Sequence, residues 1–321
     1  MIFLLCFMLG SVGSYLVSRY AHCLNLIDVP SARSSHHTPI AKGGGIGLLL
    51  AFILVSILYN APGYFWLPAA GLSLLSLQND RSELSTKVRL FAQFLAGMVL
   101  LFGSYVRGGD GFGELFLLLS AIYLPYLVGT ANFYNFMDGI NGIAGVVGIS
   151  SFSLLGVYQY ESVFGWVSTL CFAMVAACAG FLPFNVPAAK VFMGDVGSIL
   201  LGYSFAAIVV LTTATAIDFV VMSSFMLFFY LDELTSMWFR LKRKQSLLRP
   251  HRSHFYQVLA NEAGIAHWKI SLGYGIAQFI AGAAILWLGQ FGFVWPCVAI
   301  ACISFTYVKC DLLVRKKFQR S

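Results

Sequence analysis

The chain has 321 residues, of which 59% are hydrophobic and only 10% are charged, and its mean hydropathy is +0.81. A soluble domain of this length could not bury so much apolar surface, so the composition excludes that class and predicts a polytopic membrane protein. The formal net charge is +7. An excess of cations next to an anionic membrane surface explains this charge without a nucleic-acid partner.

Apolar runs of helical length recur along the chain, and a helix needs about 20 such residues to cross a bilayer. They predict an all-α polytopic membrane protein with about eleven transmembrane helices, in one membrane domain over residues 1–321. The first run follows no basic segment, so we expect a retained span and not a cleaved signal peptide. The predicted spans are 2–18, 44–60, 64–78, 90–106, 113–130, 143–158, 163–182, 197–215, 217–237, 270–288 and 292–308.

The connections between these spans differ sharply in charge. Of the 20 Lys and Arg residues, only Arg107 lies outside one alternate set of loops and the C-terminal tail. Such an excess marks the cytoplasmic side, so we expect the N-terminus outside and the C-terminus in the cytoplasm. The expected cytoplasmic loops are 19–43, 79–89, 131–142, 183–196 and 238–269.

The first cytoplasmic loop combines cations with a run of glycines. Arg33, His36, His37 and Lys42 precede the glycines at 43–45. Side chains and glycine N–H groups could together approach an anionic ligand closely. The alternative is a basic loop that only fixes the topology.

The second loop carries acids between cations. Asp80 follows Asn79, and Glu83 would share a helical face with Asp80. A carboxylate at the membrane surface could accept a proton or bind a metal. The alternative is a solvated charge cluster at the start of the next span.

A polar segment in the third loop is the strongest indication of chemistry. Asn132, Asn135 and Asp138 recur at intervals of three, so a helical turn would align them, and Asn141 follows. Amide and carboxylate oxygens suit a hard cation such as Mg²⁺. A simple Asn/Gly turn does not account for an aspartate at this spacing between two apolar spans.

The fourth loop leads into a predicted helix. Asn185 and Phe192 precede Gly194 and Asp195, which open the span at 197–215. Free N–H groups at a helix N-terminus favour a phosphate. Asp195 could instead simply cap the helix.

The fifth loop is the longest, and it contains His251, Arg252 and His254. Histidines three apart beside arginines suit diphosphate binding or stabilisation of transition-state charge. The cations at 240–244 are more typical of a topology anchor. Carboxylates, amides and cations on one membrane face are together the inventory of metal-assisted phosphoryl transfer.

Five motifs between Asp28 and Gln257, in matching order, resemble those of the polyprenyl-phosphate N-acetylhexosamine-1-phosphate transferases, glycosyltransferase family 4. The most specific are Asn-x-x-Asn-x-x-Asp-Gly-x-x-Gly at 132–142 and Phe-Met-Gly-Asp-x-Gly-Ser at 192–198. His-Arg-Ser-His-x-Tyr-Gln at 251–257 is similar to the bacterial branch that starts O-antigen and other surface polysaccharides.

The resemblance implies transfer of a sugar-1-phosphate from a UDP-N-acetylhexosamine to undecaprenyl phosphate, with release of UMP. It places this reaction in lipopolysaccharide or cell wall biogenesis, on the cytoplasmic side of the bacterial inner membrane. It implies Mg²⁺, with Mn²⁺ as an alternative. The partners are then the two substrates and membrane lipid; a homodimer is compatible with the sequence, which determines neither oligomeric state nor sugar.

The resemblance also assigns roles to residues: uracil would stack on Phe192 near Asn141 and Asn185, and Asp80 would lie near the lipid phosphate. The expected residues are Asp80, Asp138, Asp195, His251, Arg252 and His254 for catalysis; Lys42, Asn79, Asn141, Asn185 and Phe192 for substrate binding; and Asn135 and Asp195 for the metal.

Two positions depart from the family pattern. Asn79 stands where the family usually has the first of two adjacent aspartates, and Asn141 stands where it often has a second one. An amide cannot accept a proton, so either Asp80 acts alone or the ionised lipid phosphate needs no base. A catalytically weakened member or inactive scaffold is another interpretation of Asn79.

A polytopic transporter or lipid flippase is the alternative from a different functional class. Transporters place polar groups near the bilayer midplane, on broken helices. Here the polar groups cluster at the ends of predicted spans, which favours the transferase.

Overall fold

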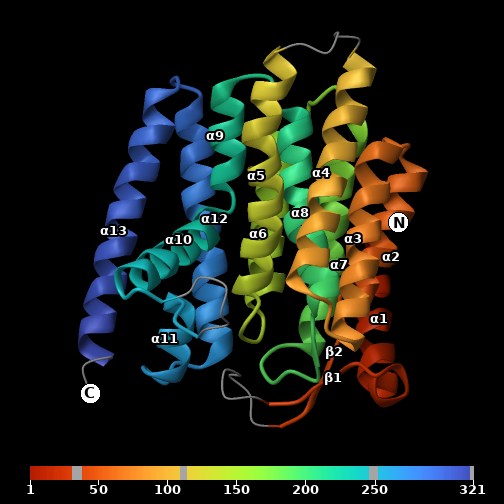
Figure 1. The fold of residues 1–321 in the computed structure, drawn as a ribbon, viewed down its shortest axis with the longest axis vertical. Coiled ribbons are helices and arrows are strands. Elements are labelled where there is room, and N and C mark those ends of the chain that lie inside the picture. The colour runs from red at the N-terminus through yellow and green to blue at the C-terminus, as the bar shows by residue number, and fades with distance from the viewer. Residues whose placement is uncertain (31–37, 109–113, 246–251, 319–321) are drawn as a thin grey trace.

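The computed structural model describes residues 1–30, 38–108, 114–245 and 252–318. In this part of the chain, helices run side by side as a bundle with a small sheet at one end (Figure 1). We call this end, where α11 and the C-terminal end of α13 also lie, the basal face. The α-helices are α1 (Ile2–Leu24), α2 (Ile46–Leu58), α3 (Gly63–Arg81), α4 (Thr86–Gly108), α5 (Glu114–Met137), α6 (Ile143–Tyr158), α7 (Gly165–Phe181), α8 (Asp195–Thr212), α9 (Ala216–Ser224), α10 (Leu227–Lys242), α11 (Phe255–Asn261), α12 (His267–Gly289) and α13 (Val294–Phe318), with a 3-10 turn at Leu182–Phe184.

Six of the described helices are long and apolar enough to cross a membrane, namely α1, α4, α7 with its 3-10 extension, α8, α12 and α13. Helices α2 and α6 are apolar but shorter. The prediction of an α-helical membrane protein is therefore confirmed. The number of eleven spans and the orientation of the termini remain predictions.

The predicted single span at 217–237 is wrong, because the structure divides it into α9 and α10. Helix α10 then runs at a slant across the lower part of the bundle (Figure 1). The buried side chain of Gln278 from α12 lies at the break: its Nε2 donates to the Ser224 carbonyl and its Oε1 accepts from the Phe228 N–H, both at 3.0 Å. A helix can break inside a membrane protein where a neighbouring side chain satisfies the freed backbone groups.

The small sheet was not predicted from the sequence. Its strands are β1 (Ile27–Asp28), β2 (Ile40–Lys42) and β3 (Val191–Phe192), in the order β1-β2-β3. Strands of two or three residues are too short to show an alternating pattern. Strand β2 runs antiparallel to β1 and parallel to β3, with Lys42 opposite Phe192. The sheet therefore joins the first of the predicted loops, 19–43, to the fourth, 183–196; we call the predicted loops at this end of the bundle the basal loops.

Helix α8 lies in the interior of the bundle, where it packs against α3 and α5. Its N-terminal end also touches α2 backbone to backbone: a Cβ added to Gly45 would lie only 2.4 Å from the Gly197 Cα. Small residues allow such close helix contacts in membrane proteins. The contact brings the glycine run at 43–45 directly against the start of α8, which is where the candidate site forms.

Candidate functional site

Asp80, at the C-terminal end of α3, caps the first turn of α8. Its two carboxylate oxygens accept hydrogen bonds from the backbone N–H groups of Asp195 at 3.2 Å and Val196 at 3.1 Å. A carboxylate here satisfies unpaired helix donors and interacts favourably with the helix dipole. The expectation that these N–H groups are free for a phosphate is therefore wrong, because Asp80 already occupies them.

Gly194 is the point at which three segments of the site meet. Its backbone has a φ of +75°, and a Cβ at this position would lie 2.7 Å from both Asp80 Oδ2 and the Gly43 nitrogen. Only glycine fits this conformation and this space without strain. The residue thus allows the first basal loop, α3 and α8 to approach one another.

Asp195 lies between two side-chain amides. Asn79 Nδ2 donates to one of its oxygens at 2.7 Å, and Asn135 Nδ2 donates to the other at 2.8 Å. Asn135 also donates to Ser198 Oγ at 2.9 Å, and Arg89 Nη1 lies 3.7 Å from Asp195. The structure therefore brings together three of the predicted site residues, and adds Arg89 from α4.

A third carboxylate lies close to Asp80 and Asp195. Burial, followed by the charges of Asp195 and Asp80, raises the pKa of Asp138 to about 7. Burial and the charge of Asp195 likewise raise the pKa of Asp80 to about 7, although the N–H groups of α8 and the charge of Lys42 lower it. Mutual repulsion of this kind is relieved when a cation binds among the carboxylates.

The side chains around Asp195 form a mixed set of donors for a divalent cation. Among the described residues, no three His, Cys, Asp or Glu side chains gather closely enough to hold a metal on their own. The set around Asp195 is instead mixed, and a half-turn of the amide of Asn79 or Asn135 would present its oxygen in place of its nitrogen. Carboxylate and amide oxygens, with water completing the shell, fit Mg²⁺ or Mn²⁺.

Asn132 does not join this group. Its amide donates to Gln93 Oε1 of α4 at 2.6 Å and to the Val128 carbonyl at 2.7 Å. Both Asn132 and Asn135 lie on the last turns of α5, which extends into the segment predicted as the loop 131–142. Their spacing of three therefore placed them on a helix as expected, but only Asn135 reaches Asp195.

Asn185 and Asn141 connect the walls of the site to each other. Asn185 is buried; its Oδ1 accepts from the Gly142 N–H, and its Nδ2 donates to the Val191 carbonyl at 2.8 Å. Asn141 Nδ2 donates to the Pro187 carbonyl at 3.2 Å. These bonds hold the loop after α5 against the segment before α8, and uracil contacts by either amide or by the half-buried Phe192 remain a prediction.

His254 is buried between two acids of α10. Its Nδ1 lies 3.4 Å from Asp232 Oδ1, and its Nε2 lies 3.5 Å from Glu233 Oε2. Its side chain is only 3% exposed, and its ring stacks on that of Tyr256. The predicted catalytic histidine therefore lies in the protein interior and is enclosed by carboxylates.

Asp232 also organises the short helix α11. It accepts hydrogen bonds from the N–H groups of Phe255 at 2.8 Å and Tyr256 at 3.2 Å, and from the hydroxyl of Tyr274 at 2.6 Å. Sequence reasoning missed Asp232 and Glu233 because both fell inside the predicted span at 217–237. Two adjacent acids within an apolar span were themselves a signal, since ionisable residues at such positions are usually functional.

Tyr256 connects this region to the carboxylate site. Its hydroxyl donates to the Phe136 carbonyl at 3.1 Å. A Cβ on Gly139 would lie only 2.2 Å from the Tyr256 hydroxyl oxygen. The segment that begins at Arg252 is thus packed against the loop that carries Asp138. Arg252 itself is exposed, and the predicted residue His251 lies outside the described residues.

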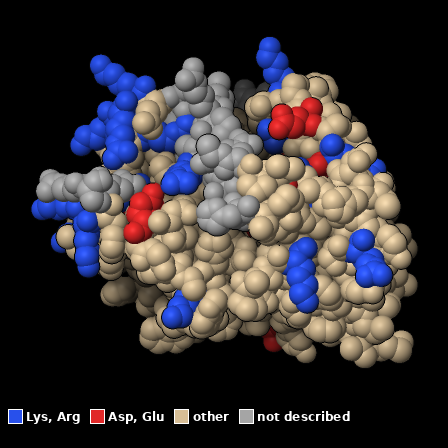
Figure 2. Space-filling model, turned by 90° about the horizontal axis from the view of Figure 1, so that it is seen from below, with Lys and Arg blue, Asp and Glu red and all other residues tan. Residues whose placement is uncertain are grey.

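The basal face carries many cationic side chains. In Figure 2, blue Lys and Arg side chains gather at one edge of this face and are scattered over the rest, whereas red acidic side chains are few. A face of this kind attracts anionic substrates and anionic lipid headgroups.

Comparisons with known proteins agree with this geometry. Residues 63–213 match the family model "Glycosyl transferase family 4". The chain is similar to an undecaprenyl-phosphate alpha-N-acetylglucosaminyl 1-phosphate transferase of Yersinia pestis, with 29% identity over 79% of this chain and 74% of the relative. It is also similar to the protein of that name from Thermotoga maritima, with 27% identity over 91% of both chains. A probable undecaprenyl-phosphate N-acetylglucosaminyl 1-phosphate transferase of Bacillus subtilis is 24% identical over 86% of this chain and 83% of its own.

Proposed function

Because the chain belongs to the polyprenyl-phosphate N-acetylhexosamine-1-phosphate transferase family, we propose that it transfers a sugar-1-phosphate from a UDP-N-acetylhexosamine to undecaprenyl phosphate. An oxygen of the lipid phosphate attacks the sugar-bearing phosphorus, and UMP leaves. The observation that carries this proposal is the convergence of Asp80, Asp138 and Asp195 with Asn79 and Asn135 at the basal ends of apolar helices.

The proposed metal site consists of Asp195 and Asn135, with Asp138 close by. Bound Mg²⁺ would neutralise the diphosphate and the charge that develops on the leaving UMP. Asn79 and Asn135 orient the Asp195 carboxylate, one at each oxygen. Catalysis of this kind depends mainly on the positions of charged and polar groups. In this site those groups are already held in place before the substrate binds.

We assign Asp80 to positioning and not to proton transfer. Both of its oxygens already accept an N–H from the first turn of α8, one from Asp195 itself and one from Val196, and these bonds fix the backbone that carries the Asp195 side chain. A phosphate monoester is largely ionised near neutral pH, so the acceptor can attack without a base. This assignment favours the second of the two readings left open by Asn79.

The proposed orientation places the basal face in the cytoplasm of a bacterial inner membrane, with the N-terminus outside. The cations of this face support it, because cytoplasmic loops carry such an excess. The product would be the first lipid-linked sugar of a surface polysaccharide such as O-antigen. The names of the relatives favour N-acetylglucosamine as the first sugar to test.

The experiment combines purified protein with Mg²⁺, undecaprenyl phosphate and a panel of UDP-sugars, and measures released UMP. We expect release with at least one UDP-N-acetylhexosamine and none without the lipid acceptor. Folded protein that releases no UMP with any sugar would contradict the proposal.

Replacing Asn79 by Asp tests the departure from the family pattern. The new carboxylate would lie next to Asp195, where Asn79 now donates a hydrogen bond at 2.7 Å. A bound divalent cation compensates the added charge, so we expect turnover with Mg²⁺ that equals or exceeds that of the parent. Without metal, the repulsion should lower the unfolding temperature. A large loss of turnover in Asn79→Asp would show instead that the site depends on the amide.

Binding of Mg²⁺ can also be measured without turnover, through its effect on thermal stability at two pH values. The pKa values of Asp80 and Asp138 rise from 3.8 to about 7 in the folded protein. The contribution of these two carboxyl groups to folding stability is therefore fully present below pH 3.8, and it is lost as the pH rises through about 7. We expect the metal-free protein to unfold at a lower temperature at pH 8 than at pH 6.

Mg²⁺ should raise the unfolding temperature more at pH 8 than at pH 6, because it binds the ionised carboxylates. Asp195→Asn serves as the comparison and should show little of this Mg²⁺ effect. An equal Mg²⁺ effect in the parent and in Asp195→Asn would rule out the proposed metal site.

A further inference from the structure

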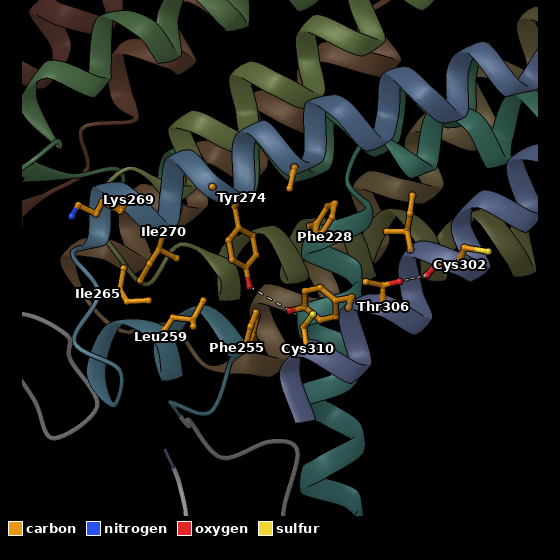
Figure 3. Close-up of a pocket in the computed structure, with 14 residues that line it drawn as sticks. Phe228, Phe255, Leu259, Ile265, Lys269, Ile270, Tyr274, Cys302, Thr306 and Cys310 are labelled. Carbon is orange, nitrogen blue, oxygen red and sulfur yellow. Dashed lines mark hydrogen bonds between the residues drawn. The ribbon is translucent and has the colours of Figure 1, made fainter. Parts of the chain in front are cut away.

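An apolar pocket of about 600 Å³ lies between α10, α11, α12 and α13, apart from the carboxylate site (Figure 3). Its walls are formed mainly by aromatic and branched side chains, among them Phe228, Phe255, Ile270, Tyr274, Ile303 and Tyr307. The volume falls within the range of about 300–1,000 Å³ that is usual for small-molecule sites. The proposed reaction does not use this pocket.

The pocket lies where two membrane helices face the bilayer. Helices α12 and α13 are both long and apolar enough to cross a membrane. Large apolar side chains next to the pocket, such as Leu272 and Ile276 on α12 and Phe305 on α13, are exposed and would contact lipid. A pocket with this lining and position is suited to a hydrocarbon chain.

A cation lies at the basal end of the pocket. Lys269, in the first turn of α12, is exposed and contributes to the lining, and Figure 3 shows it at the end of the row of lining side chains. Lys309 on α13 is adjacent to the lining residue Cys310. A lysine at the membrane surface favours an anionic headgroup.

We propose that this pocket binds an acyl chain of an anionic phospholipid, with the headgroup phosphate at Lys269. The polyprenyl acceptor is less suitable, because its phosphate must reach the carboxylates near Asp195. No residue that lines the pocket belongs to the group around Asp195, and the buried Asp232 and His254 lie behind the Tyr274 wall of the pocket. The pocket therefore takes a second lipid, which is not consumed.

The bound chain would act on the buried network behind the pocket wall. The hydroxyls of Tyr274 and Tyr307 lie 3.3 Å apart in the pocket, and Figure 3 shows the bond from Tyr274. Tyr274 also donates to Asp232 Oδ2 at 2.6 Å, and the other oxygen of Asp232 lies beside His254. A lipid chain packed on Tyr274 thus holds the tyrosine in the position that orients Asp232.

Gly273 offers a direct way to fill the pocket. It contributes to the lining, and a Cβ added to it would meet no atom within 4 Å. Gly273→Leu therefore adds apolar volume at the pocket wall from a Cβ that meets no other atom. Gly71 on α3 is the matched control, because a Cβ there also meets open space but lies on another helix.

The test is a lipid titration of the delipidated full-length protein, read by native mass spectrometry. Phosphatidylglycerol is the anionic probe and phosphatidylcholine the neutral one. We expect the parent and Gly71→Leu to bind phosphatidylglycerol about fivefold more tightly than phosphatidylcholine. Gly273→Leu should bind phosphatidylglycerol at least tenfold more weakly, and Lys269→Gln should lose the preference between the two lipids.

Two results would overturn the proposal. One is phosphatidylglycerol binding that is unchanged in Gly273→Leu, or a preference that survives in Lys269→Gln. The other is displacement of phosphatidylglycerol by undecaprenyl phosphate in the parent, which would assign the pocket to the acceptor. If Gly273→Leu fails to fold, Ala277→Leu at the same wall makes the same comparison. Binding is measured without turnover, so its failure is distinct from failure of the proposed reaction.

Discussion

Replacing Asp195 by asparagine should reduce turnover at least about 100-fold and leave the protein folded. Asp195 is the acid on which two amides and an arginine converge, and it is the central ligand of the proposed metal site. A metal that stabilises transition-state charge contributes several kcal/mol, which corresponds to a loss of this size. The measurement is UMP release at saturating Mg²⁺, compared with the parent at equal protein concentration.

Asp218→Asn is the matched control for Asp195→Asn. Asp218 also lies in the first turn of a helix, α9, where it accepts from the Thr215 N–H at 2.8 Å and from the Tyr158 hydroxyl at 2.6 Å. None of these groups belongs to the site, so turnover should stay near that of the parent. Turnover of Asp195→Asn that is within a few-fold of the parent would remove Asp195 from the mechanism.

Replacing His254 by alanine should have the largest effect on stability, a loss of about 3–5 kcal/mol. The imidazole lies within 3.5 Å of both Asp232 and Glu233, and all three side chains are buried. Its removal leaves the buried carboxylates of Asp232 and Glu233 next to each other without the imidazole between them. Thermal unfolding can be followed with a thiol-reactive dye, because the buried Cys6, Cys171 and Cys178 become accessible only when the helices separate.

Arg252→Ala separates the structural role of this segment from its chemical one. Arg252 is exposed, so its removal should leave the unfolding temperature unchanged while it lowers turnover.

Glu233→Gln combined with His254→Ala should recover part of the stability that His254→Ala loses, because one of the two repelling charges is gone. A His254→Ala protein as stable as the parent would show that the imidazole does not stabilise the buried acids.

The sequence was a good guide to the residues that meet, and a weaker guide to how they meet. The motifs at Asp80, Asn135 and Asp195 predicted a shared site, and the structure places the three in one hydrogen-bonded group. The sequence could not show that Asp80 caps the helix of Asp195, since the contact joins residues 115 positions apart. It also could not show that the side-chain amide of Asn185 is hydrogen-bonded to the backbone of Gly142 and Val191.

The hydropathy pattern was informative for the positions of helices but concealed the second cluster, Asp232, Glu233 and His254. Hydropathy merges α9 and α10 because the residues at the break, Phe225 and Met226, are as apolar as those of the helices. The backbone groups at the break are satisfied by Gln278, which comes from a distant part of the chain. In the single predicted span at 217–237, Asp232 and Glu233 lie near the end of a helix. The prediction therefore gave no indication that these two acids enclose His254.

The cap that Asp80 provides for α8 has a consequence for the order in which the chain is made. Asp195 lies 115 positions after Asp80, and at about 5–20 residues per second the ribosome needs roughly 6–23 s to synthesise the intervening segment. During that interval α3 is already synthesised, while the Asp80 carboxylate has no helix N-terminus to cap. A chain arrested before α8 is therefore expected to remain incompletely packed at its basal end, and to be recognised by quality-control proteases that ignore the finished protein.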